Sequence, residues 1–173
     1  MEALTYWKAV VVDRSNLLER LIGALEEHDV DYCVVGGQAV NAYVEPLVSL
    51  DLDLAITAKD AARIESVLGS DLSVERFAHS IHVSQQGSDL RVQFQTDPRY
   101  AAFPASARRR PVLGLELPVA RLEDVLDGKV WAALDSTRRP SKRQKDLADI
   151  SRILERFPEL RERVPSEIAD QLL

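Results

Sequence analysis

The feature that most constrains the fold is an apolar run that ends in two glycines and is followed by a segment carrying two acids. The run is Val34-Val35-Gly36-Gly37-Gln38-Ala39, and the second segment is Leu50-Asp51-Leu52-Asp53-Leu54. Side chains on a strand alternate between its faces, so Asp51 and Asp53 share one face while the leucines point into a core. The pattern predicts a strand, a glycine turn, a short helix and a second strand that presents paired carboxylates.

Each half of this element has a chemical use and a plainer alternative. Gly36 and Gly37 let the backbone approach a phosphate and leave amide groups free at the start of the helix. Asp51 and Asp53 lie close enough together to hold one or two divalent cations. Together these groups are the minimum equipment for moving a nucleotidyl group. The alternatives are a glycine turn required only by sterics and a solvated strand face.

In this order and spacing, the two motifs resemble the nucleotidyltransferase superfamily of DNA polymerase beta type, and most closely its AbiEii-like toxin branch of minimal nucleotidyltransferases. Proteins of that branch carry a Gly-Gly or Gly-Ser turn, an Ala and a Tyr on the next helix, and an Asp-x-Asp strand. The matching positions here are Gly36, Gly37, Ala39, Tyr43, Asp51 and Asp53. The resemblance implies that the two acids bind Mg²⁺ as the cofactor and that the two glycines cradle the triphosphate of an NTP.

Length and composition bound the class of protein. The chain has 173 residues, 46% of them hydrophobic, and a formal net charge of −6, which fits one domain with a buried core. The negative charge argues against non-specific binding to nucleic acid, although a local basic patch can still bind it. The single cysteine, Cys33, excludes an intramolecular disulfide, and its apolar neighbours predict a buried thiol. Without a signal peptide or an apolar stretch of membrane length, we expect a cytoplasmic protein with no membrane partner.

Hydrophobic periodicity predicts strands and helices in alternation through the first half of the chain. The expected elements are a helix capped by Ser15 or Asn16, a core strand over Tyr32–Val35, a helix from Gln38 to Tyr43, the acid-bearing strand from Val48 to Ile56, and a helix that begins at Thr57 or Lys59-Asp60 and stops at Gly69.

The second half predicts a hairpin and then helices. The hairpin joins Ile81–Ser84 to Asp89–Gln95, a short strand follows near Leu115–Leu117, and a long helix runs from Ser141 to Arg156. We therefore expect an α/β (α+β) fold, nucleotidyltransferase-like, with a small mixed β-sheet flanked by helices. Residues 1–118 would form the core, and residues 119–173 a C-terminal helical lobe of the same compact unit.

The resemblance also implies a third carboxylate on the strand beside the Asp-x-Asp pair, and that position falls on Gln93. A glutamine cannot accept a proton from an attacking hydroxyl, and it binds Mg²⁺ weakly beside a carboxylate. Asp89 shares the face of Gln93 but lies about 13 Å away along the strand. Two carboxylates can still hold one Mg²⁺ on a triphosphate, because the phosphates supply ligands themselves. A glutamine at position 93 is therefore expected to weaken nucleotidyl transfer more than nucleotide binding.

A second cluster of charged residues lies around Lys129 and on the helix that carries Lys145, Asp146 and Asp149. The family resemblance implies that Lys129 contacts the nucleotide phosphates, with Lys145 as a further nucleotide-binding residue. It also implies that Asp146 or Asp149 orients the basic groups of the site. Spacing alone fits a solvated helix, in which these two acids share a face and pair with Lys142 and Lys145.

Three further features have more than one interpretation. Positive charge concentrates at Arg138, Arg139, Lys142, Arg143 and Lys145, which suits a triphosphate or an RNA end but equally a solvated loop and helix start. Arg108-Arg109-Arg110 before Pro111 predicts an exposed loop, with an RNA contact as the alternative. Trp131 fits a core position better than a platform for base stacking.

The sequence thus predicts an Mg²⁺-dependent nucleotidyltransferase-like protein of the AbiEii toxin type, with Asp51, Asp53, Lys129 and Asp149 at its catalytic centre. By this resemblance it would transfer a nucleotidyl group from NTP to an RNA end, such as that of tRNA, or to a protein hydroxyl. A cognate antitoxin or toxin is the implied protein partner. The alternative, favoured by Gln93, Gly37 and Leu47, is a catalytically weakened NTP-binding or partner-binding component of a toxin–antitoxin pair.

Overall fold

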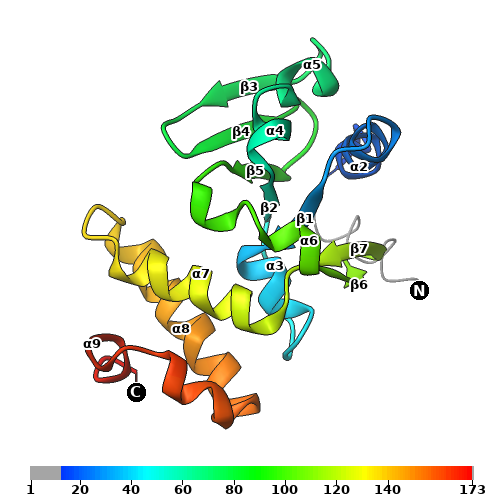
Figure 1. Cartoon of the computed structure of the whole chain (residues 1–173). Helices are drawn as coiled ribbons and strands as arrows, with labels where there is room; N and C mark the ends of the chain where they lie inside the picture. The colour runs from blue at the N-terminus through cyan, green and yellow to red at the C-terminus, as the bar shows by residue number, and fades with distance from the viewer. Residues whose placement is uncertain (1–12, 173) are drawn as a thin grey trace.

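Seven strands form one mixed sheet in the computed structural model, which describes residues 13–172. In chain order they are β1 (Tyr32–Val35), β2 (Asp51–Ile56), β3 (Ser73–Arg76), β4 (Ser80–Ser84), β5 (Arg91–Gln95), β6 (Arg108–Val112) and β7 (Leu115–Val119). Their order in the sheet is β3-β4-β5-β2-β1-β7-β6 (Figure 1). β2 is parallel to β5 and β1 to β7, whereas the other neighbours are antiparallel.

Helices flank this sheet, and the longest of them follow its last strand. The helices are α2 (Leu17–Glu27), α3 (Gly36–Asn41), α4 (Ala58–Ala61), α5 (Ile64–Leu68), η1 (Pro98–Tyr100), α6 (Phe103–Ser106), α7 (Leu122–Leu134), α8 (Pro140–Arg156), η2 (Pro158–Arg163) and α9 (Ser166–Ala169). Figure 1 shows α7, α8 and α9 gathered at the end of the molecule away from β3. This architecture confirms the fold class expected from the sequence, while the domain boundary after residue 118 stays a prediction. Within residues 13–172, no helix combines the length and apolar character needed to cross a bilayer.

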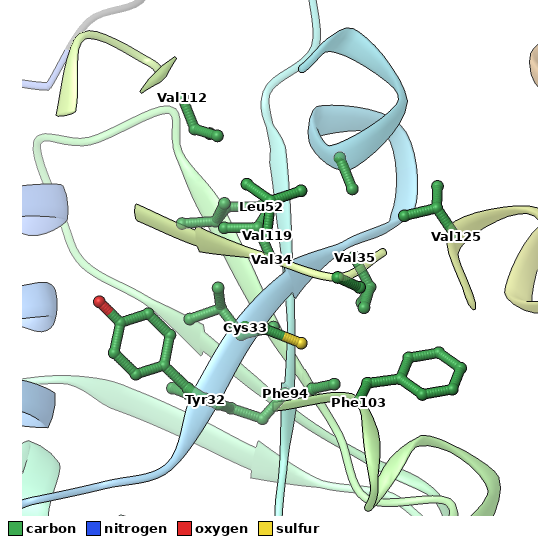
Figure 2. Packing of buried hydrophobic residues seen from close by; sticks show 14 of the residues in the cluster. Tyr32, Cys33, Val34, Val35, Leu52, Phe94, Phe103, Val112, Val119 and Val125 are labelled. Carbon is green, nitrogen blue, oxygen red and sulfur yellow. The ribbon is translucent and has the colours of Figure 1, made fainter. Parts of the chain in front are cut away.

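The apolar faces of the central strands form the core (Figure 2). Leu52 and Leu54 of β2 are fully buried, as the alternation with the two acids predicts, and Phe94 of β5 extends the same layer. Cys33 of β1 is also fully buried, which confirms the expected core thiol, and burial raises its pKa to about 12. α2 adds an apolar stripe to this core, consisting of Leu17, Leu18, Leu21, Ile22 and Leu25.

Strand β1 has the predicted bounds, and other elements depart from their predicted bounds for identifiable reasons. β2 begins at Asp51 rather than Val48, and α3 already begins at Gly36. The helix expected after Thr57 is divided into α4 and α5, and α5 ends before Gly69 at φ 81°. The strand β3 has no counterpart in the predicted elements, and most of its residues are exposed, so it shows little alternation.

The exposed loop expected at Arg108–Arg110 is wrong, because these residues begin strand β6. Among the strands of residues 13–172, β6 is the last in the sheet and pairs with β7 alone, so Pro111 and the charged side chains are tolerated there. Arg110 stacks its guanidinium on the ring of Tyr43, at 4.1 Å from the ring centroid. The Tyr43 hydroxyl in turn donates to the backbone oxygen of Ala120 at 2.7 Å.

Asn16, one of the two predicted residues, takes the N-cap position of α2, but the side chain that caps the helix is that of Asp13, and the predicted cap Ser15 is wrong. The Asp13 carboxylate accepts hydrogen bonds from the backbone N–H of Leu17 at 3.0 Å and of Leu18 at 3.4 Å. Ser15 instead donates its hydroxyl to Asp13 at 3.1 Å, and Asn16 has φ 53° with no side-chain capping bond. A carboxylate at this position also complements the positive end of the helix.

We expect Asp13→Ala to lower the free energy of unfolding by about 1–2 kcal/mol, the usual cost of losing a helix cap. Ser15→Ala is the matched control, since it removes one hydrogen bond to Asp13 but leaves both helix amides capped. Urea denaturation followed by circular dichroism measures both. Equal losses in the two variants would contradict the assignment of Asp13 as the cap.

Candidate functional site

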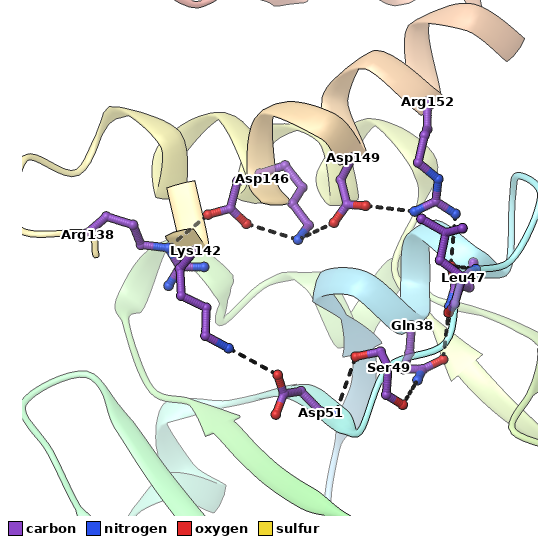
Figure 3. Close-up of polar contacts among 11 residues, drawn as sticks. Gln38, Leu47, Ser49, Asp51, Arg138, Lys142, Asp146, Asp149 and Arg152 are labelled. Carbon is purple, nitrogen blue, oxygen red and sulfur yellow. Dashed lines mark hydrogen bonds and ion pairs between the residues drawn. The ribbon is translucent and has the colours of Figure 1, made fainter. Parts of the chain in front are cut away.

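The two predicted metal ligands lie side by side on the polar face of β2. In the register of the sheet, Asp51 is beside Arg91 of β5 and Asp53 is beside Gln93. The Asp51 carboxylate contacts Arg91 Nε at 2.8 Å and Lys142 Nζ at 3.1 Å. Figure 3 shows Lys142 reaching down from α8 to this carboxylate. One acid of the pair is thus neutralised by two cations of its own chain.

Within residues 13–172, Asp53 makes no such ion pair, and it packs against the glycine turn. A Cβ atom at Gly36 would lie 2.2 Å from Asp53 Oδ2, and Gly36 has φ 65°, so only glycine fits here. Burial raises the pKa of Asp53 to about 6, with Lys129 acting in the opposite direction and Asp51 adding to the rise. Ionised Asp53 is therefore electrostatically costly in the folded protein, and a bound cation would relieve that cost.

Lys129 of α7 lies between two acids of α8. Its Nζ is 3.0 Å from Asp146 Oδ1 and 2.7 Å from Asp149 Oδ2, and the residue is only 8% exposed. Burial alone lowers the pKa of Lys129, but Asp149 and Asp146 outweigh it and raise the pKa above its ordinary value. The lysine therefore stays charged and ties α7 to α8 through buried ion pairs.

Two arginines complete this network. Arg138 Nε contacts Asp146 Oδ2 at 2.8 Å, and Arg152 contacts Asp149 Oδ1 at 2.7 Å (Figure 3). Three cations, counting Lys129, share two carboxylates, which leaves the network one positive charge in excess. Arg152 also donates to Asn41 Oδ1 at 3.0 Å, so the same network fixes the end of α3.

The carboxylates of β2 stand where two cavities meet. The larger has a volume of about 960 Å³ and lies between the polar face of β2, β4 and β5 and helix α7, whereas the smaller has about 160 Å³ and lies between α3, the segment before β2, and α8. Ligand pockets commonly measure about 300–1,000 Å³, so the larger cavity suits a nucleotide or a substantial acceptor. Both cavities are lined by Asp51, Asp53, Lys129, Arg138, Lys142 and Asp146.

The other predicted site residues take different places around this junction. Gly36 lines the larger cavity, whereas Gly37, Lys145 and Asp149 line the smaller one. Lys145 is exposed, and a Cβ atom at Gly37 would meet nothing within 4 Å. Trp131 is half-buried on the wall of the larger cavity, with Arg99 stacked 4.9 Å from its ring centroid.

Sequence reasoning missed the ion pairs of Asp51. Arg91 alternates with the apolar residues of β5 on the face of Gln93, so aligning β5 beside β2 in the right register would have found it. Lys142 is 91 residues from Asp51 in the sequence, and no local pattern links the two. The expected pairing of Lys142 with the acids of its own helix is replaced by this long-range contact.

The donor atoms at the junction fit a Mg²⁺ ion held together with a nucleotide. Mg²⁺ prefers oxygen ligands and is usually bound through one or two carboxylates, with phosphates and water as the other ligands. Asp51 and Asp53 supply such carboxylates on one strand face. Across residues 13–172, no group of three or more His, Cys, Asp or Glu is placed to hold a metal, so the phosphates would have to complete the coordination.

Replacing Gly36 by alanine is expected to destabilise the protein by at least about 2 kcal/mol, because the new Cβ meets Asp53 and the left-handed backbone becomes strained. Gly37→Ala is the matched control in the same turn. It should leave the free energy of unfolding unchanged or raise it by up to about 1 kcal/mol. Thermal and urea unfolding measure both, and equal effects would contradict the close contact at Gly36.

Asp53→Asn is expected to stabilise the metal-free protein at neutral pH. Folding raises the pKa of Asp53 to about 6. The folded parent therefore has its full stability at pH values below the pKa of Asp53 in the unfolded chain, and it loses stability as pH rises through 6. The asparagine variant lacks this loss, so its advantage should be near zero at pH 4 and about 3 kcal/mol at pH 7.5. Urea denaturation across this pH range measures it, and a pH-independent difference would refute the explanation.

Comparison with known proteins supports the fold. No protein-family model matches the sequence, and no curated protein does. Among solved structures, the solution structure of the antibiotic-resistance factor ANT(2″)-Ia aligns with this chain with a TM-score of 0.60 at 15% identity. The alignment covers 91% of this chain and 87% of that one. Its crystal structure in complex with adenylyl-2″-tobramycin aligns with a TM-score of 0.58 at 15% identity, over 91% and 98%.

Two further structures are similar to this chain. The lincosamide antibiotic adenylyltransferase LnuA, bound to lincomycin, aligns with a TM-score of 0.51 at 13% identity, over 83% of this chain and 99% of that one. A nucleotidyltransferase-like protein from Paracoccidioides brasiliensis aligns with a TM-score of 0.50 at 18% identity, over 84% and 78%. At these identities the likeness concerns the fold, and it does not select the AbiEii-like branch. The chain therefore has a nucleotidyltransferase-like fold.

Proposed function

We propose that this protein is an Mg²⁺-dependent nucleotidyltransferase that transfers a nucleotidyl group from NTP to a hydroxyl. The observation that carries the proposal is the pair Asp51 and Asp53 on one face of β2, at the junction of two cavities and beneath a cluster of cations. One of these cavities would hold the NTP, and the other would hold the acceptor. The nucleotidyltransferase-like fold of the chain supports the same reaction class.

The cations of the chain would bind and orient the triphosphate. Lys142 lies 3.1 Å from Asp51 Oδ2, so a metal ion on Asp51 would compete with it and leave its amine free for phosphate oxygens. Lys129 is held by Asp146 and Asp149, and its network keeps one positive charge in excess beside the carboxylates. Mg²⁺ bound by Asp51 and Asp53 would neutralise phosphate charge and polarise the phosphorus under attack.

The acceptor in this proposal follows from the resemblance of the sequence to AbiEii-like toxins. It would be an RNA 3′ end, such as that of tRNA, or a protein hydroxyl, with a cognate antitoxin or toxin as the partner. ANT(2″)-Ia and LnuA act on antibiotics, so hydroxyls of small molecules form a competing acceptor class. A transfer assay that offers each of these acceptors separates the classes.

A second candidate is an NTP-binding module with weakened catalysis. The observation in its favour is Gln93, which lies beside Asp53 in the register of β2 and β5, where the family resemblance implies a third carboxylate. A neutral amide neither accepts a proton nor adds charge to the metal site. This candidate predicts Mg²⁺-dependent NTP binding without transfer.

The test is incubation with each of the four α-³²P-labelled NTPs and Mg²⁺, in the presence of total tRNA, cell protein, tobramycin or lincomycin. Asp51→Asn/Asp53→Asn should lower transfer by about 1,000-fold or more, because several kcal/mol of transition-state stabilisation are lost. Asp127→Asn is the control, since Asp127 pairs with Arg163 and lines neither cavity.

Label on one acceptor class in the parent and in Asp127→Asn, but not in the double variant, would establish the transferase and its acceptor. NTP binding that the double variant loses, with no label on any acceptor, would support the binding module instead. Equal transfer by the parent and the double variant would overturn both candidates.

A further inference from the structure

A row of polar side chains crosses four neighbouring strands at the floor of the larger cavity. In register, Asp53 of β2 lies beside Gln93 of β5, Gln93 beside His82 of β4, and His82 beside Glu75 of β3. Residues paired across adjacent strands project to the same face, so the four side chains share one side of the sheet. All four line the same cavity. Figure 1 shows the order of the strands that carry them.

Within this row, Asp53 is a proposed metal ligand and the side chain of Gln93 is neutral. His82, and Glu75 at the sheet edge, are therefore the groups left to take up a proton. The two steps from Asp53 to His82 place their Cα atoms about 9–10 Å apart. That gap, above the neutral side chain of Gln93, can accommodate an acceptor oxygen and a phosphate between the carboxylate and the imidazole. Glu75 lies one strand further out and is exposed.

The imidazole of His82 is held in place on one side. Its Nε2 lies 3.2 Å from the hydroxyl oxygen of Ser80, and its ring packs on Phe77 with the centroids 4.5 Å apart. Among residues 13–172 no hydrogen bond is made to Nδ1. When Nε2 carries the proton and donates it to Ser80, Nδ1 presents the lone pair that a base needs.

We propose that His82 is the general base of the nucleotidyl transfer and takes the part that a third carboxylate would otherwise have at Gln93. This inference rests on the proposed function. His82 Nδ1 removes the proton of the acceptor hydroxyl as its oxygen forms a bond to the α-phosphorus. The bond from this phosphorus to the bridging oxygen breaks, pyrophosphate leaves with that electron pair, and the imidazolium later releases its proton to water.

The first test does not depend on turnover. The chain has only three histidines, so their imidazole signals can be resolved in ¹⁵N-correlated NMR spectra. Adding Mg²⁺ with the α,β-methylene analogues of ATP, GTP, CTP and UTP should shift the signals of His82 and leave those of His28, at the end of α2, unchanged. Binding of an analogue without any shift at His82 would overturn the proposal, because the base must lie beside the α-phosphate.

The second test measures transfer in variants. His82→Gln should lower the rate of label transfer by about 100-fold or more, the usual contribution of a general base, while the Kd for Mg²⁺ and analogue stays within threefold. His28→Gln should transfer at the rate of the parent. In the double variant His82→Gln/Gln93→Asp, a carboxylate beside Asp53 should restore transfer at least tenfold over His82→Gln.

Transfer by His82→Gln within threefold of the parent would overturn the role of His82 and leave the proposed function intact. Loss of transfer without recovery in the double variant would also overturn it, since His82 would then act through structure. A parent that neither binds the analogues nor transfers label would overturn the proposed function and this inference together.

Discussion

The site depends on the electrostatic cost of placing two carboxylates next to each other on one strand face. Asp51 contacts two cations from distant parts of the chain, which offsets this cost, whereas Asp53 is half-buried against the glycine turn and its pKa rises to about 6. A structure that keeps such a pair gives up stability that leucine or valine at these positions would provide. The simplest physical reason to retain it is a cation that binds there and compensates both charges.

The fold keeps this pair beneath a positively charged cluster of ion-paired side chains. The ion pairs of Lys129 with Asp146 and Asp149 join α7 to α8. Arg152 extends this network to α3. The ion pairs that join these helices therefore also set the electrostatic potential over the two carboxylates of β2. Each of the two carboxylates of the network contacts two cations, so loss of one carboxylate would leave the buried Lys129 and two arginines with a single acid to compensate them.

Much of the central sheet could be predicted from the sequence, because its signals are local. The run Tyr32–Val35 and the alternation of Asp51–Ile56 specify strands and faces directly, and the position of Gln93 beside Asp53 followed from the resemblance. Strand β6 was missed because arginines and a proline are tolerated only at a sheet edge, which the sequence does not reveal. The contact of Lys142 with Asp51 joins residues that only tertiary packing brings together.

The metal–nucleotide site is tested most directly by the binding of Mn²⁺, as a spectroscopic substitute for Mg²⁺, in the presence and absence of a non-hydrolysable NTP analogue. Electron paramagnetic resonance measures free Mn²⁺ and hence the bound fraction. We expect the analogue to strengthen Mn²⁺ binding to the parent, and we expect Asp51→Asn/Asp53→Asn to abolish this coupling. Equal Mn²⁺ and analogue binding by the parent and the variant would contradict the claim that these carboxylates form a metal–nucleotide site.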